Sequence, residues 1–519
     1  MPRTPWMSMR AVAIAIAAAV CVQGQPVARV DAAEDAAQNP AAAPRFEVAF
    51  ATYLGGANWD EAREVIECAD GTILIGAQSS SVDMPTTEGS LQPQYAGDDP
   101  ALGASGVYGG DCWLARVSGD GGKVLAATFF GGSRQERNVY GLALDRANNP
   151  VIASATRSLD APTTEGGFQM TFGGGASDML VAKLSADLCR LIWCTYVGGR
   201  AEDSPRGGLT LDDQDNVIVV GTTSSPDFPT TWGTVQPRLR GARDSAIVKL
   251  SSDGTRLIFG TYLGGSGEDD AIMGVRLDGR GNLHLAGHTK STDFPVTPSA
   301  AQPKAGGESD CYLASLDSNA SRILHATYLG GRGNEFAEHR PLLLDDGTMV
   351  LTGFTGSDDF PSTPGACQSR PRGKSDGFVT SLSPDGSRWI FSTCIGGSEG
   401  ENWLMPTRGP DGNIFVVGST SSHDFPVTED ALQKEFGGGR EDAAIALLSA
   451  DGSRLLYASY LGGRGDDLIR CIAVTPRGEL LLAGRTSSDD FPVSPGAIQN
   501  RHRGGGDAFL VKLAPCAAR

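Results

Sequence analysis

Thr52-Tyr53-Leu54-Gly55-Gly56 decides the fold, because close variants of this stretch return throughout the chain. The first glycine of each pair lies at Gly55, Gly131, Gly198, Gly264, Gly330, Gly396 and Gly462. The intervals are 76, 67 and then four times 66 residues, and the extra residues of the first unit fall between Gly97 and Gly106. Seven such units account for nearly all of the sequence from Phe46 onward, which leaves no room for a second domain.

Each unit has the pattern of four short strands. In the fourth unit we expect strands A to D at residues 271–277, 283–289, 310–316 and 323–329, separated by turns rich in Gly, Asp and Asn. Helical periodicity is absent from all seven copies. A long repeat with four strands per copy is typical of a β-propeller blade.

The two ends of the repeat region complement one another. Residues 46–54 form a strand D with no A, B or C before it, and the last unit stops after strand C at Leu513. We therefore predict an all-β, seven-bladed β-propeller over residues 46–513, with four antiparallel strands per blade and the N-terminal strand completing the last blade. Residues 514–519 are expected to be a C-terminal tail. Closure of this kind removes the open sheet edges that promote aggregation.

The composition excludes one class of partner, and the N-terminus indicates a location. The chain has 519 residues with 43 Lys and Arg against 61 Asp and Glu, a net charge of −18. This balance excludes a typical nucleic-acid binder. Arg3 and Arg10 precede a short apolar run, so we predict a signal peptide over 1–24 and a flexible lead-in over 25–45. We expect a monomer that is secreted, periplasmic or at the cell surface, with no integral membrane segment after signal removal.

Two carboxylates recur at fixed positions and are expected to fix turns, since Asp at a strand start or before Pro commonly accepts backbone N–H bonds. One opens strand C, at Asp111, Asp178, Asp244, Asp310, Asp376, Asp442 and Asp507. The other belongs to an Asp-x-Pro triplet, at Asp83, Asp160, Asp227, Asp293, Asp359, Asp424 and Asp490. The paired glycines are expected to supply either positive φ angles or a close approach between neighbouring segments.

A third recurrent acid follows each glycine pair and varies between Asp and Glu. Its seven copies are Asp60, Glu136, Asp203, Asp269, Glu335, Glu401 and Asp467. Tolerance for both acids favours a requirement for charge, so these residues are our ligand-binding candidates, predicted to form a ring near one mouth of the channel. Calcium is a possible ligand. The alternative is seven solvated turn residues or partners of nearby arginines.

The combined motif resembles a known family. Thr-Tyr-Leu-Gly-Gly, Leu-Asp-x-x-Gly-Asn, Gly-x-Thr-Ser-x-Asp-Phe-Pro-x-Thr and Asp-Ala-Phe-x-x-Lys-Leu together resemble the SBBP family, the seven-bladed propeller repeat of bacterial secreted and surface proteins. The resemblance implies a propeller and an extracytoplasmic setting, and it transfers no catalytic residue. The first two units depart from it, with Met84 and Ala161 in place of the loop Phe.

Other candidate sites are sparse. Residues 396–400 match the Gly-x-Ser-x-Gly pattern, but the sister repeats carry Arg332 or Arg464 at the Ser position, so we interpret the match as fortuitous. His284 and His288 share a strand face and could bind a metal. Ten cysteines occur, and removal of Cys21 with the signal leaves nine, some of which would be expected to pair in an exported protein.

We therefore expect a recognition or scaffold propeller that binds an unidentified ligand on its loop-rich face, where the D-to-A and B-to-C connections lie. The ligand could be a glycan, a protein or a cation. The alternative is an extracytoplasmic propeller enzyme, a hydrolase, lyase or quinone-dependent dehydrogenase, with its site at the channel mouth. Such an enzyme should break the repeat symmetry, and the departures are the insertion, the two histidines and the Glu338-His339-Arg340 run. The sequence assigns no catalytic residue and no certain cofactor.

Overall fold

The computed structural model describes residues 45–97, 109–270, 274–337 and 339–516. Residues 43–519 belong to one compact unit. The predicted signal peptide and nearly all of the lead-in lie outside the described residues, so those predictions stay predictions. All regular secondary structure in the described part of the chain is β.

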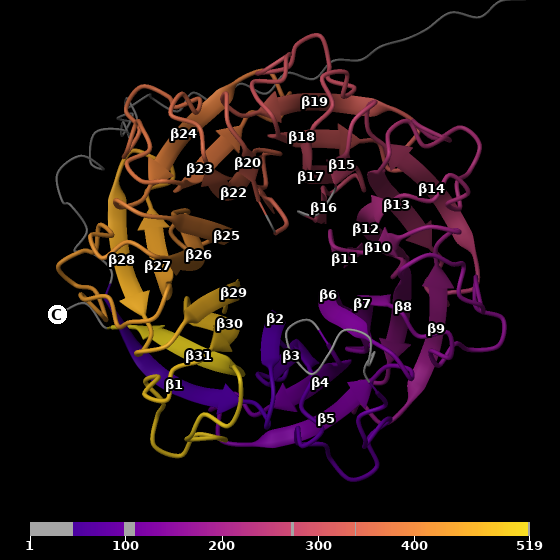
Figure 1. Ribbon diagram of the computed structural model, residues 1–519, viewed down its shortest axis with the longest axis horizontal. Coiled ribbons are helices and arrows are strands. Elements are labelled where there is room, and N and C mark those ends of the chain that lie inside the picture. The colour runs from indigo at the N-terminus through magenta and orange to yellow at the C-terminus, as the bar shows by residue number, and fades with distance from the viewer. Residues whose placement is uncertain (1–44, 98–108, 271–273, 338, 517–519) are drawn as a thin grey trace, which may run out of the picture. The chain divides into compact units, whose positions relative to one another are not determined.

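The strands form seven separate antiparallel sheets arranged in a ring around an axis (Figure 1). Blade 1 consists of β2 (Asp60–Glu67), β3 (Ile73–Ser79), β4 (Asp111–Val117) and β5 (Val124–Phe130). Blade 2 consists of β6 (Glu136–Leu144), β7 (Pro150–Thr156), β8 (Asp178–Leu184) and β9 (Leu191–Val197). Blade 3 consists of β10 (Asp203–Ser204), β11 (Leu209–Leu211), β12 (Val217–Thr223), β13 (Asp244–Leu250) and β14 (Leu257–Leu263). Blade 4 consists of β15 (Asp269–Asp270), β16 (Val275–Leu277), β17 (Leu283–Thr289), β18 (Asp310–Leu316) and β19 (Ile323–Leu329).

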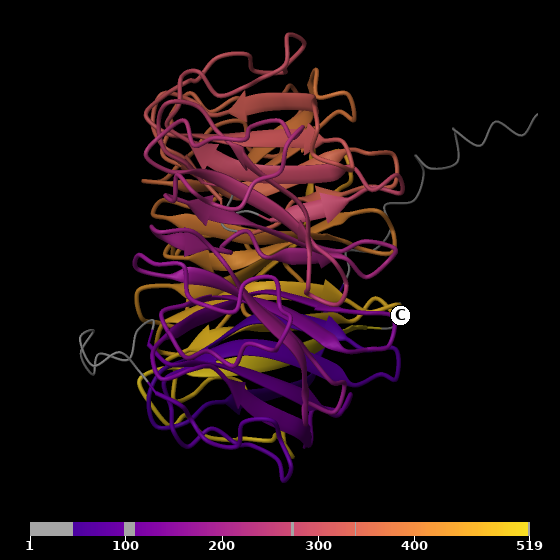
Figure 2. The same ribbon diagram turned by 90° about the vertical axis from the view of Figure 1, so that its right-hand side faces the viewer.

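The remaining blades follow the same order. Blade 5 consists of β20 (Glu335–Phe336), β21 (Leu342–Leu343), β22 (Met349–Thr355), β23 (Asp376–Leu382) and β24 (Trp389–Ile395). Blade 6 consists of β25 (Glu401–Arg408), β26 (Ile414–Thr420), β27 (Asp442–Leu448) and β28 (Leu455–Leu461). Blade 7 consists of β29 (Asp467–Val474), β30 (Leu480–Thr486), β31 (Asp507–Pro515) and β1 (Phe46–Leu54). The predicted seven-bladed propeller is confirmed, and Figure 2 shows the ring from its side.

The ring closes as the sequence predicts. Strand β1 pairs antiparallel with β31, from Phe46 opposite Pro515 to Leu54 opposite Ala508, and supplies the outer strand of blade 7. The Phe46 ring packs against Phe415 and Tyr457 at centroid distances of 5.8 and 5.1 Å. The first and last strands of the propeller therefore fasten one another.

Strand A differs from the prediction in blades 3 to 5, where it is divided into two short segments. In blade 3 the division falls at residues 205–208, because Pro205 lacks a donor N–H and Gly208 has a φ of 72°. In blade 4 only β16 lies within the predicted strand 271–277, β15 lies just before it, and residues 271–273 are outside the described part of the chain. The innermost strands are thus the irregular ones, which is where the blades differ most.

The glycine pairs are explained by close approach, since none of these glycines has a positive φ. A Cβ placed on Gly198 would lie 2.5 Å from Asp178 Oδ1 and 2.9 Å from Asp203 Oδ2. A Cβ on Gly199 would lie 2.6 Å from Ser225 Cβ and 2.7 Å from Asp227 Oδ1. Carboxylates from blades 2 and 3 therefore converge on this turn, and only glycine leaves room for them.

Candidate functional site

The seven ligand-binding candidates lie inside the blades and not in an accessible ring. Asp60, Glu136, Asp203, Asp269, Glu335, Glu401 and Asp467 are at most 2% exposed. Each accepts the backbone N–H of the second glycine of its turn, as in the 2.7 Å bond from Gly199 N to an Asp203 oxygen. Each side chain therefore folds back into its own turn, and these carboxylates are not exposed to solvent as a ring of ligands would be.

Hydroxyl groups from the end of strand B complete these carboxylate sites. Ser225 donates to Asp203 at 2.8 Å, and Thr355 and Ser357 both donate to Glu335 at 2.6 Å. Asp and Glu both reach the same donors, which accounts for the variation between them. The contacts favour turn fixing, and a calcium or ligand role for these seven residues stays a prediction. No three His, Cys, Asp or Glu side chains within the described residues are placed to hold a metal ion together.

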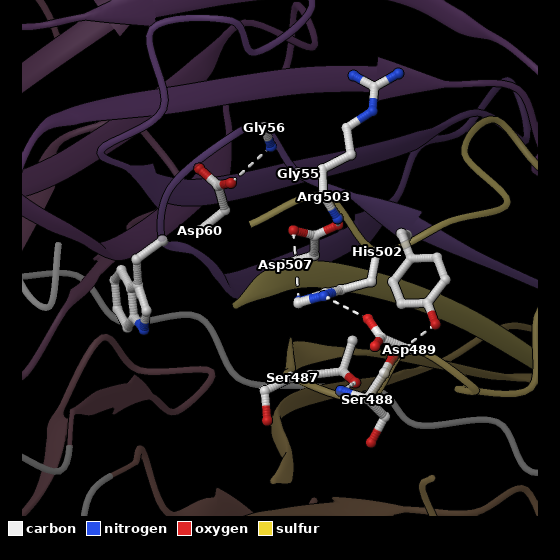
Figure 3. Close-up of polar contacts among 12 residues, drawn as sticks. Gly55, Gly56, Asp60, Ser487, Ser488, Asp489, His502, Arg503 and Asp507 are labelled. Carbon is white, nitrogen blue, oxygen red and sulfur yellow. Dashed lines mark hydrogen bonds and ion pairs between the residues drawn. The ribbon is translucent and has the colours of Figure 1, made fainter. Parts of the chain in front are cut away.

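The buried carboxylates also come close to the aspartates that open strand C. Figure 3 shows the copy at the closure, where Asp60 accepts from Gly56 and Asp507 lies beside His502. Burial raises the pKa of Asp60 to about 7, although hydrogen bonds from Gly56, Ser79 and Ser81 oppose the shift. Burial and the neighbouring Asp203 together raise the pKa of Asp178 to about 7. The turns that contain Asp60 and Asp178 therefore each hold an acid that titrates near neutrality.

The two histidines of the fourth unit do not share a ligand. His284 Nδ1 lies 2.8 Å from Ser315 Oγ, while His288 Nε2 lies 3.0 Å from Asp270 Oδ2. Each ring has its own partner, which leaves no reason to place a metal between them.

The expected disulfides are also not found. The nine cysteines from Cys68 to Cys516, all of them in the described part of the chain, are free thiols, and six of the nine are buried. The six buried cysteines behave as small apolar core residues, since burial raises the pKa of thiols such as Cys112 and Cys194 above the usual range.

The blades differ from one another at the axis of the ring, where a network of ion pairs crosses the channel. Arg340 of blade 5 makes bidentate contacts of 3.1 and 2.8 Å with Glu64 of blade 1. Glu61 lies 2.8 Å from Arg470 and 3.2 Å from Arg63. The side chains of the two glutamates are at most 4% exposed, so both charges are compensated within the channel.

Positive charge exceeds negative charge in this network. Burial and the neighbouring Arg340 together lower the pKa of Arg276 to about 9, although Glu64 opposes the shift. Burial together with Arg63, Arg470 and Arg340 holds the pKa of His339 well below its ordinary value. His339 is therefore neutral, and the Glu338-His339-Arg340 departure contributes to an arginine-rich channel.

A pocket opens beside this network, between blades 2 and 3. Its lining residues are Arg137, Ala155, Arg157, Ser177, Glu202, Ser204, Arg206, Thr222 and Arg243, around a cavity of about 40 Å³. Arg137 follows the first residue of β6, Arg157 follows the end of β7, and Arg243 precedes the start of β13. All three lie at strand ends joined by D-to-A or B-to-C connections, so the pocket belongs to the loop-rich face.

Two of the pocket arginines, Arg243 and Arg137, differ from their counterparts in every other blade. The position of Arg243 is occupied in the other blades by Gly110, Ser177, Ser309, Ser375, Glu441 and Gly506. The position of Arg137 is occupied by Glu61, Ser204, Asp270, Phe336, Asn402 and Leu468. These positions surround the mouth and change from blade to blade, whereas the glycines and buried acids do not. The residues that build the blades are therefore the same type in each repeat, whereas the residues around the mouth are not.

Elsewhere around the mouth the variable residues have partners within the protein. Glu441 accepts from Ser419 at 2.7 Å, and the rings of Phe336 and Phe354 lie 5.5 Å apart. Arg206, by contrast, forms no ion pair or hydrogen bond with any described residue, although it lines both the pocket and the channel. The pocket therefore contains a guanidinium group with its donors available.

Two acids near the pocket lie close to one of its arginines. Arg243 lies 3.2 Å from Glu202 and 4.0 Å from Asp270. Burial would raise the pKa of Asp270, but its hydrogen bond from His288 and the guanidinium groups of Arg243 and Arg206 lower it below its ordinary value. The lining therefore contains one carboxylate and an arginine, Arg206, that has no ion pair or hydrogen bond with any described residue, and this arrangement is suited to holding a negatively charged group.

The chain was compared with known proteins. No family model matches it, and no curated protein matches it. Among solved structures, it is similar to BamB from Moraxella catarrhalis at 12% identity and a TM-score of 0.38, over 90% of this chain and 99% of that one. It is similar to quinohemoprotein alcohol dehydrogenase from Comamonas testosteroni at 12% identity and a TM-score of 0.42, over 92% and 77% of the two chains. It is also similar to a polysaccharide lyase of family PL25, an ulvan lyase, at 11% identity and a TM-score of 0.44, over 83% and 92%.

At these identities the similarities concern the fold alone. The described residues include no helix of the length and apolarity needed to cross a membrane.

Proposed function

We propose that this protein is an extracytoplasmic recognition propeller that holds its ligand on the loop-rich face, at the pocket between blades 2 and 3. The observation that carries the proposal is Arg206, which forms no ion pair or hydrogen bond with any described residue, in a pocket where Arg137 and Arg243 differ from their counterparts in every other blade. A scaffold alone has no need of such a departure. A rigid ring with a variable mouth is a common basis for recognition.

The setting and the family belong to the same proposal. The basic, apolar start of the sequence supports export, and the repeated motif supports membership of the SBBP family. We expect the protein to act as a monomer, because the ring closes on itself and leaves no unpaired blade. The ligand would then meet the protein outside the cytoplasm.

The proposal is tested by blocking the pocket without removing its arginines. Glu202 lies at the rim with a side chain that is 45% exposed, so Glu202→Trp should obstruct entry while leaving the blade intact. Arg256→Trp, on the opposite face in the C-to-D turn of the same blade, is the matched control. Both variants and the parent are applied to an array of saccharides and peptides.

We expect Glu202→Trp to lose the ligands that the parent and Arg256→Trp retain. Equal binding by all three proteins, or loss only in Arg256→Trp, would show that the ligand does not use this face.

A further inference from the structure

We propose that the pocket between blades 2 and 3 binds a single oxyanion group, such as a carboxylate or a sulfate, that projects from the ligand. This inference rests on the proposed function and adds the chemical class that the site selects. It is carried by the available donors, the charge and the size of the pocket.

The donors point to an oxygen-rich acceptor. Arg206 forms no ion pair or hydrogen bond with any described residue, and it lines the pocket together with Ser204 and Thr222. Both of these wall residues are only 6% exposed. A planar guanidinium fork matches the paired oxygens of a carboxylate or sulfate.

The charge excludes a cation and favours an anion. Among the lining residues only Glu202 opposes the arginines, and its side chain already lies 3.2 Å from Arg243. Asp270 is held by His288 at 3.0 Å and lies 4.0 Å from Arg243. The chain as a whole carries a charge of −18, so this local excess of arginine is not a general property of its surface.

The size limits what enters. A cavity of about 40 Å³ accommodates the volume of roughly three water positions, at about 10–15 Å³ each, which suits one small oxyanion. A sugar ring or a peptide backbone does not fit inside it. The body of the ligand must therefore lie across the mouth, with its anionic group directed into the pocket.

The test uses the full-length protein with sodium sulfate and sodium D-glucuronate as probes and D-glucose as the neutral control. Binding is measured by calorimetry at fixed ionic strength. We expect both anions to bind and glucose not to bind. Arg206→Gln should weaken anion binding at least tenfold, since it removes charge-assisted hydrogen bonds.

Two further variants make the test specific. Arg332→Gln removes the same charge from an exposed arginine on the same face, where it pairs with Asp359 at 3.2 Å, and should change the dissociation constant less than twofold. Glu202→Gln removes the competitor for Arg243 and should tighten anion binding severalfold. If Arg206→Gln does not fold, Arg243→Gln provides the same comparison.

Equal affinity of the parent, Arg206→Gln and Arg332→Gln would overturn the inference, as would binding of glucose equal to that of glucuronate. Failure here is separable from failure of the proposed function. If the array yields a neutral ligand that Glu202→Trp blocks, the recognition face stands and the oxyanion class is wrong. Binding of sulfate but not glucuronate, or the reverse, identifies which oxyanion the pocket accepts.

Discussion

Removal of the N-terminal strand should abolish the closed monomer. Deleting residues 46–56 exposes the edge of β31 and removes Phe50, Tyr53 and Leu54, which are between 1% and 6% exposed. Each such side chain contributes roughly 1.5–3 kcal/mol on burial. The deletion therefore costs on the order of 5–10 kcal/mol, which is comparable with the whole stability of a typical domain at about 5–15 kcal/mol.

A milder variant tests the same contact quantitatively. The Tyr53 hydroxyl donates to Ser488 O at 2.7 Å and accepts from Phe491 N at 3.1 Å. Tyr53→Phe should lower the free energy of unfolding by about 1–3 kcal/mol, because one hydrogen bond is lost at each of two buried groups. Tyr328→Phe is the matched control, since its hydroxyl makes the equivalent bonds within continuous chain in blade 4.

Urea denaturation and size-exclusion chromatography provide the measurements. We expect similar losses for the two Tyr→Phe variants, and oligomers or unfolded chains for the deletion. A deleted protein that stays monomeric and melts with the parent would refute the closure. So would a Tyr53→Phe variant that loses nothing while Tyr328→Phe is destabilised.

Three further predictions concern the turns and the channel. Gly198→Ala should lower the free energy of unfolding by about 1–3 kcal/mol in urea titration, because its Cβ would overlap two carboxylates, whereas Gly279→Ala, with open space around it, should cost less than 1 kcal/mol. Burial raises the folded-state pKa of Asp203 to about 6, so the folded state binds the proton more tightly, and stability should fall as the pH rises from about 4 to 7. Asp203→Asn should reduce that slope in urea titrations across this range, and an unchanged slope would contradict the assignment. Arg340→Met should destabilise the protein by about 3–5 kcal/mol because it leaves Glu64 uncompensated, and adding Glu64→Met should restore part of the loss in thermal melts.

The architecture could be predicted from the sequence because the repeated units define the number of blades and the strands within each blade. The spacing of the glycine pairs, the strand patterns and the incomplete first and last units are local features, and each has the same meaning in every copy. The closure by residues 46–54 could be predicted for the same reason. These residues form a strand D that has no blade of its own, and the last blade lacks a strand D.

The candidate site could not be predicted in the same way. Asp203 and its six counterparts appeared to be ligand residues because they are always acidic, but a repeated position does not reveal whether its side chain points outward or folds into its own turn. The pocket residues could not be predicted for a different reason, because they do not repeat and are distant from one another in the sequence. Arg137 and Arg243 stand more than a hundred residues apart, at two different repeat positions, and only the packing of blade 2 against blade 3 brings them together. A search for mouth positions that differ between the repeats would have singled them out.

The pocket and the axial network also share a residue, since Arg206 lines both. The Arg340–Glu64 pair blocks the axis beneath it with a desolvated ion pair. A ligand is thus expected to contact the mouth and not to pass through the ring. This arrangement fits recognition better than transport through the channel.

The most direct measurement of the central claim is a crystal structure of the full-length protein grown with sodium selenate, whose selenium atom gives an anomalous signal and whose oxygens mimic a sulfate. The account predicts an anomalous peak in the pocket, within hydrogen-bond distance of Arg206 and Arg243, that disappears in Arg206→Gln crystals of the same form. An empty pocket beside ordered selenate ions at exposed arginines such as Arg332 would contradict it.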